Sequence, residues 1–191
     1  LSILLQYSVQ AQKVSKESAV EVYENIITAI GNSSPIPPIL EFKESNSNPA
    51  SFNPFKKKIT IEEKVLEICY FFGPDSLNAL AYILSHELAH SYCRHGWHTQ
   101  FAALDFSNQI DEDLASFEKR IDNETQADVY AGFFSHIAGY NALDIAGDFL
   151  KKVYSEYDLP DSIPGYPSFK ERLLIIESNK AEFLKLKRVY D

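Results

Sequence analysis

The spacing of apolar residues along the chain predicts that most of it is helical. From Ser15 to Ile30 apolar residues recur every three or four positions, which is typical of a helix with one buried face. The stretch GNSSPIPP, residues 31–38, then interrupts the pattern, because glycine and proline disfavour a continuing helix. The same spacing predicts five further helices, at 64–72, 75–96, about 114 or 118 to 137, 141–156 and 168–187.

Two short segments near the front have the composition of strands. ILEF (39–42) and KKITI (57–61) flank a polar loop rich in Ser, Asn and Pro. A small sheet followed by a mainly helical part predicts the α+β class. The chain has 191 residues, of which 45% are hydrophobic, enough for one sizeable core. We therefore expect a single domain over residues 12–191.

Composition restricts the partners. The formal net charge of -9 argues against nucleic acid or an anionic membrane surface as the main partner. No apolar run reaches the roughly 18 to 20 residues of a membrane-spanning helix, so we expect no transmembrane segment in this chain. Cys69 and Cys93 are the two cysteines, and the sequence leaves open whether they pair.

The first residues have features of a processed leader. Residues 1–5, LSILL, followed by Val9-Gln10-Ala11, match the end of a signal peptide that is cleaved before Gln12. This predicts export to the periplasm or the extracellular space. The alternative is an ordinary apolar segment of a soluble intracellular protein. The chain contains no Met, which favours a fragment of a longer protein.

The strongest chemical signal is HELAH at residues 86–90, within the helix predicted at 75–96. His86 and His90 are one helical turn apart, so both rings project from the same side. Two imidazoles in this arrangement can chelate a zinc ion, and Glu87 beside them can take a proton from a water that zinc makes acidic. The alternative is a polar helix face whose histidines form hydrogen bonds and bind no metal.

A catalytic zinc site needs a third protein ligand and one open position. NETQAD, residues 123–128, places Glu124 and Asp128 on one face of a later predicted helix. Glu124 can supply a carboxylate ligand, and Asp128 can accept the free ring N–H of a ligating histidine. Ala127 and Ala131 are small enough to let this helix approach the first one closely. The alternative is an exposed acidic face. The sequence thus predicts one zinc ion per chain.

HELAH followed by E-x-x-A-D resembles the gluzincin zinc metallopeptidases, specifically the HtpX-like and CAAX prenyl endopeptidase type. The similarity covers roughly residues 57–176, and this chain resembles the soluble members of the family. The resemblance implies a zincin-like fold and a zinc-dependent endopeptidase. It also implies the roles of five residues: His86, His90 and Glu124 as zinc ligands, Glu87 as general base, and Asp128 as the residue that orients a ligand.

A later segment carries the resemblance further. GYPSFKERLLII (165–176) is similar to the family's H-P-x-x-x-x-R segment and matches it at Pro167 and Arg172. The match implies that Arg172 pairs with an acid near the site, such as Asp128; the alternative is an arginine on a helix surface. Tyr166 stands where the family has histidine. It can donate a hydrogen bond to a developing oxyanion, or it can fill a loop as an aromatic side chain.

The expected substrate is a peptide or a protein. In zincins an edge strand precedes the active-site helix, and the strand at 57–61 has that place in the order of elements. We therefore expect an extended peptide to add to this strand as a further strand. Three alternatives remain open: a zinc amidase acting on non-peptide substrates, a catalytically silent domain that serves as a scaffold, and a latent form in which one chain terminus lies in the cleft.

Overall fold

The computed structural model describes residues 14–31, 36–95, 99–100 and 114–190, and it confirms the α+β class. The possible leader at residues 1–11 lies outside these ranges. No helix in the described ranges has the length and the apolar content needed to cross a bilayer. The elements are α1 (Lys16–Ile30), β1 (Ile39–Lys43), β2 (Ala50–Asn53), β3 (Lys58–Glu62), α2 (Glu63–Tyr70), a 3₁₀ turn (Gly73–Asp75), α3 (Ser76–Tyr92), β4 (Thr99–Gln100), α4 (Leu114–Ile137), α5 (Ala142–Glu156) and α6 (Phe169–Tyr190).

Every helix and strand predicted from the apolar spacing is present, with ends that differ by a few residues. Two strands were not predicted. β2 lies in the loop that was expected to be polar, and only Ala50 and Phe52 within it are buried. β4 is two residues long. Such short segments carry too few alternating positions for a period of two to be recognised.

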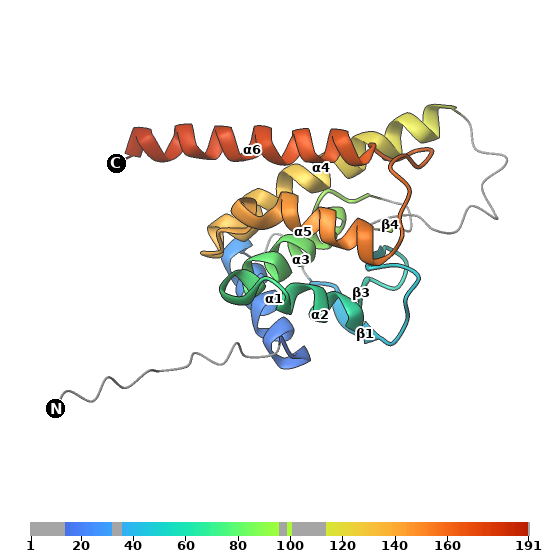
Figure 1. Ribbon diagram of the computed structural model, residues 1–191, viewed down its shortest axis with the longest axis horizontal. Helices are drawn as coiled ribbons and strands as arrows, with labels where there is room; N and C mark the ends of the chain where they lie inside the picture. The colour runs from blue at the N-terminus through green and yellow to red at the C-terminus, as the bar shows by residue number, and fades with distance from the viewer. Residues whose placement is uncertain (1–13, 32–35, 96–98, 101–113, 191) are drawn as a thin grey trace.

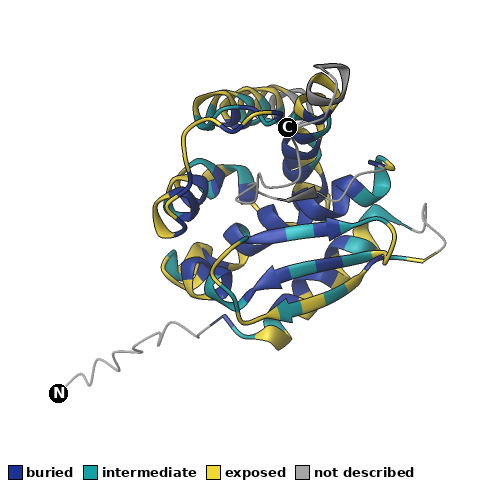
Figure 2. Cartoon of the chain, turned by 90° about the vertical axis from the view of Figure 1, so that its right-hand side faces the viewer, coloured by how far each residue is buried: buried dark blue, intermediate teal, exposed yellow. Residues whose placement is uncertain are grey.

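The sheet has the order β1-β3-β2-β4, so β3 is an interior strand. It runs parallel to β1 and antiparallel to β2. Its buried residues Ile59 and Ile61 lie on the core face with Phe52, whereas alternate positions on the strands are more exposed (Figure 2). The expectation that β3 receives a peptide as an edge strand is therefore wrong, because its neighbours already use the backbone hydrogen bonds on both of its sides.

Helix α3 runs through the middle of the molecule and contacts α1, α2, α4, α5 and β2 (Figure 1). Every residue from Ala79 to His90 is buried. Leu77 near the start of the helix is exposed, whereas the polar face further along is enclosed. Polar side chains on this face must therefore find partners within the protein, because a buried polar group without one is costly.

Helix α3 ends at Tyr92, before the end predicted at residue 96. Arg94 adopts a left-handed conformation with φ of 56°. Its N–H donates to the Ser91 carbonyl at 3.2 Å, and the His95 N–H donates to the His90 carbonyl at 2.9 Å. This pair of bonds is a Schellman motif, with Arg94 at the position that glycine usually occupies. The motif turns the chain back so that His95 lies beside the end of α3.

Close packing of α4 on α3 gives a test of the fold. Ala131 on α4 has no exposed surface, so Ala131→Leu should lower the free energy of unfolding by about 1–3 kcal/mol through overpacking. Val129→Leu adds bulk at an exposed position of the same helix and should change it by less than about 0.5 kcal/mol. Urea denaturation of both variants measures the difference. Equal effects would contradict the close approach of the two helices.

Candidate metal centre

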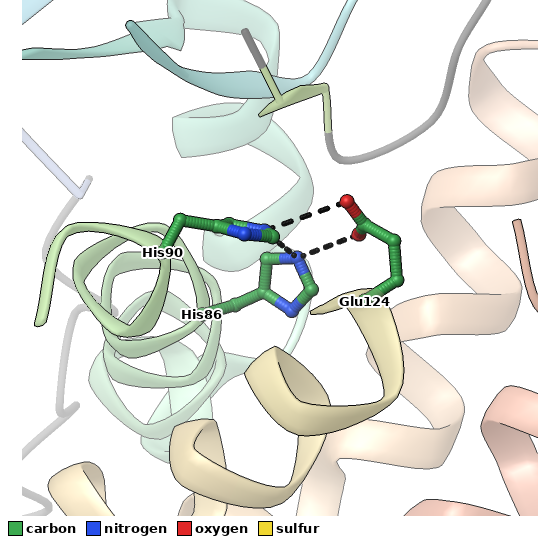
Figure 3. A group of neighbouring side chains, drawn as sticks. All are labelled: His86, His90 and Glu124. Atoms are coloured by element: carbon green, nitrogen blue, oxygen red, sulfur yellow. Dashed lines mark hydrogen bonds and ion pairs between the residues drawn. The ribbon is translucent and has the colours of Figure 1, made fainter. Parts of the chain in front are cut away.

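His86 and His90 on α3 meet Glu124 on α4 (Figure 3). The Nε2 atoms of the two histidines are 3.2 Å apart. Glu124 Oε2 lies 3.4 Å from His86 Nε2, and Oε1 lies 3.6 Å from His90 Nε2. One ligand atom from each of the three residues lies within 4.8 Å of the others, and all three residues are buried. Two imidazole nitrogens and one carboxylate oxygen can therefore hold a metal ion at this point.

The Glu124 carboxylate faces the Nε2 atoms of both histidines. Oε2 is within ion-pair distance of His86 but accepts no hydrogen bond among the described residues. Burial raises the pKa of Glu124, against the opposing effects of His86 and Arg172.

Asp128 lies behind His86, on the side away from Glu124. Its Oδ1 accepts from His86 Nδ1 at 2.9 Å and from the Tyr82 hydroxyl at 3.1 Å. Arg172 on α6 donates to both carboxylate oxygens, from Nε to Oδ2 at 2.8 Å and from Nη2 to Oδ1 at 2.7 Å. The structure thus places Asp128 and Arg172 in the contacts that the resemblance implied. Tyr82 was not predicted to take part, because it stands in an apolar helix.

The bond to Asp128 fixes the ring of His86. A carboxylate only accepts, so His86 Nδ1 carries the proton and Nε2 faces His90 and Glu124. Burial by itself would lower the pKa of His86, but the hydrogen bond to Asp128 and the interaction with the Glu124 carboxylate outweigh burial and raise the pKa to about 9. Burial would raise the pKa of Asp128, yet Arg172 and His86 hold it well below its usual range.

Glu87 is fully buried, and neither of its carboxylate oxygens has a hydrogen-bond partner among the described residues. Burial raises the pKa of Glu87 to about 8, with His86 acting in the opposite direction. A buried carboxyl group without partners is costly, and in native proteins it marks a water, an ion or a catalytic role. A group that titrates in this range can accept and release a proton near neutral pH.

Two further polar residues continue the cluster beyond His90. His90 Nδ1 lies 2.8 Å from His95 Nδ1, and His95 Nε2 lies 2.9 Å from Gln126 Oε1. Burial lowers the pKa values of both histidines, that of His90 well below its ordinary value. The sequence analysis gave neither His95 nor Gln126 a functional role. The sequence signal for Gln126 was its position within NETQAD, between Glu124 and Asp128, which were both predicted to lie at the metal site.

Tyr166 lies in the loop between α5 and α6, where it is partly buried against the hydrophobic core. Its N–H donates to the Ile163 carbonyl at 3.1 Å. Its part in stabilising an oxyanion stays a prediction. Cys69 and Cys93 are both free, which answers the question of pairing that the sequence left open.

Comparison with known proteins identifies no relative. No family model, no curated protein and no solved structure matches the chain. The resemblance to gluzincin peptidases therefore remains an expectation drawn from short motifs. The structure contributes a buried His-His-Glu group with Asp128 and Arg172 behind it.

The buried pair of Asp128 and Arg172 predicts a large stability effect. Asp128→Ala should lower the free energy of unfolding by about 3–5 kcal/mol, because it leaves a buried guanidinium without its carboxylate. Asp148→Ala removes an exposed pair with Lys151 and should cost less than about 1 kcal/mol. Urea denaturation in the presence of a chelator measures both. An Asp128→Ala variant as stable as Asp148→Ala would contradict the importance of the pair.

The pKa of His86 predicts how pH changes the stability of the metal-free protein. The folded pKa of about 9 lies above the ordinary value of 6.5, so the stabilisation is complete below pH 6.5 and is lost as pH rises through about 9. The raised pKa of Glu87, about 8 against 4.5, acts in the same direction. The urea midpoint in chelator should therefore fall between about pH 6.5 and pH 8.5.

Zinc should oppose this trend. Metal competes with the proton on His86, so the stabilisation by added zinc should increase over the same pH interval. Urea midpoints measured with and without zinc at each pH give the comparison. A midpoint in chelator that rises with pH, or a zinc effect that shrinks with pH, would contradict the assigned protonation of His86.

Proposed function

We propose that this chain is a zinc-dependent endopeptidase of the gluzincin type. His86, His90 and Glu124 are the proposed zinc ligands, and Glu87 is the proposed general base. The observation that carries the proposal is the buried Glu87 carboxylate, which has no hydrogen-bond partner in the part of the chain that the structure describes and lies next in sequence to a three-residue donor set. A structural zinc site has four protein ligands and no use for such a carboxylate, whereas a catalytic site has three ligands and an open position.

Zinc fits the residues present. Two imidazoles with one carboxylate form a donor set typical of catalytic zinc, and their ligand atoms converge within 4.8 Å. The carboxylate of Glu124 compensates part of the charge of a divalent cation in this buried setting. Among the described residues, one Glu124 oxygen and both Glu87 oxygens accept no hydrogen bond, so Glu124 can coordinate a metal ion and Glu87 can accept a hydrogen bond from a water molecule. The proposal is therefore one zinc ion per chain.

Each residue then has a definite task in peptide hydrolysis. Bound zinc supplies Lewis acidity, which polarises a carbonyl group and makes water more acidic. Glu87 accepts a proton at its carboxylate as the water oxygen adds to the carbonyl carbon, and it then donates that proton to the nitrogen of the departing amine. Asp128 holds His86 through its Nδ1–H. Tyr166 is the proposed hydrogen-bond donor to the oxyanion.

One observation favours a second candidate, a latent or catalytically silent domain with the same zinc site. His86 and His90 have 0% of their surface exposed, and Glu124 has 3%. A peptide carbonyl reaches such a site only after a rearrangement. In the latent form the chain binds zinc but cleaves no peptide. Zinc content and cleavage therefore separate the two candidates when both are measured on the same sample.

Glu87→Gln tests the catalytic proposal. The amide keeps the size of the side chain but cannot accept the proton, so the rate of peptide cleavage should fall by at least about 10²-fold. The zinc content should stay unchanged, because Glu87 is not a proposed ligand. Glu118→Gln removes an exposed acid on α4 and should leave the rate unaltered. His90→Ala should lose the zinc itself.

Cleavage of a peptide library by the wild-type chain, and by each variant, gives the rates, and elemental analysis gives the zinc. A Glu87→Gln variant as active as the wild type would overturn the assigned mechanism. A wild-type chain that holds zinc and cleaves nothing would instead favour the latent candidate.

A further inference from the structure

We propose that His95, oriented by Gln126, sets the tautomer of His90 and so keeps its Nε2 free to bind metal. The inference rests on the metal site of the proposed function and adds a positioning residue to it. It starts from the two contacts that continue the cluster beyond His90, at 2.8 Å to His95 and 2.9 Å from His95 to Gln126. Neither contact belongs to the set of ligands.

The direction of both hydrogen bonds follows from the contact between His95 and Gln126. An amide oxygen only accepts, so His95 Nε2 carries the proton that Gln126 Oε1 accepts. The other nitrogen of a neutral His95 ring is then an acceptor. His90 must donate to it from Nδ1, which leaves the lone pair on His90 Nε2. That atom faces His86 Nε2 at 3.2 Å and Glu124 Oε1 at 3.6 Å, where the metal ion is proposed.

Different chemical groups thus orient the two proposed histidine ligands. Asp128 fixes His86 with a carboxylate, whereas His95 fixes His90 with a neutral ring. The acidic residues near the site explain why His90 is oriented by a neutral ring. Glu87, Glu124 and Asp128 are all buried around the two histidine rings. A further carboxylate behind His90 would add like charge in a low-dielectric setting, which is costly. A neutral ring specifies the tautomer without that cost.

The backbone at the end of α3 builds the contact. The Schellman motif at Arg94 brings His95 back, and its N–H bonds to the carbonyl of His90, the residue whose ring it orients. The two rings meet edge to face, with centroids 5.0 Å apart and planes at 67°. His95 is buried, with 5% of its surface exposed, whereas Gln126 is exposed. Water can therefore replace the Gln126 oxygen, but not the His95 nitrogen.

Zinc affinity of three variants tests the proposal by competition with a chelator. His95→Leu should weaken zinc binding by about 10–100-fold, as loss of a residue that orients a metal ligand does. His95→Asn places an acceptor oxygen where Nδ1 stood and should restore most of the affinity. His136→Leu removes an exposed histidine of α4 and should leave the affinity unchanged. If His95 served only to fill space, the zinc affinities would have the reverse order, with His95→Leu close to the wild type and His95→Asn weaker.

The tautomers can be read directly in the metal-free wild-type protein. Nitrogen-15 NMR of the imidazole rings should show the Nδ1–H form of His90 and the Nε2–H form of His95. An Nε2–H form of His90 would overturn the proposal, even where the His95 variants do not fold. A wild-type chain that binds no zinc would contradict the proposed function instead, and the NMR result would still decide the tautomer.

Discussion

The ion pair between Asp128 and Arg172 is the interaction on which the candidate centre depends. It joins α4 to α6 in a fully buried setting, and Asp128 also binds His86 and Tyr82 of α3. Three helices are therefore held by one carboxylate. Because Glu124 lies one turn before Asp128 on α4, the contacts of Asp128 also fix the place of Glu124 opposite the histidines. Without the guanidinium, a buried carboxylate with these partners would be costly.

Burying this cluster has a thermodynamic consequence. Helix α3 is enclosed on all sides between Ala79 and His90, so its polar residues are removed from water. Hydrogen bonds to Asp128 and His95 offset this cost for the two histidines, whereas Glu87 has no such partner within the described ranges. A protein that keeps an unsatisfied carboxyl group in its interior sacrifices stability, and sites of this kind are commonly functional. This buried carboxyl group is the proposed base.

Local geometry explains which parts were predictable from the sequence. The helical period alone predicts that His86 and His90 project from the same side, and the apolar spacing predicts the helix itself. The role of His95 needs the left-handed turn at Arg94, a residue that rarely adopts this conformation, and it was therefore missed. The interior place of β3 depends on pairing with segments distant in sequence, which no local pattern encodes. The complete enclosure of α3 depends on the same kind of distant contacts.

The metal content and coordination of the purified chain test the central claim most directly. Elemental analysis and zinc-edge X-ray absorption can be carried out on the same wild-type sample. We expect about one zinc per chain, with only nitrogen and oxygen neighbours at about 2.0–2.2 Å. A chain that neither retains zinc nor takes it up, or a zinc with a sulfur neighbour at about 2.3 Å, would contradict a site formed by His86, His90 and Glu124.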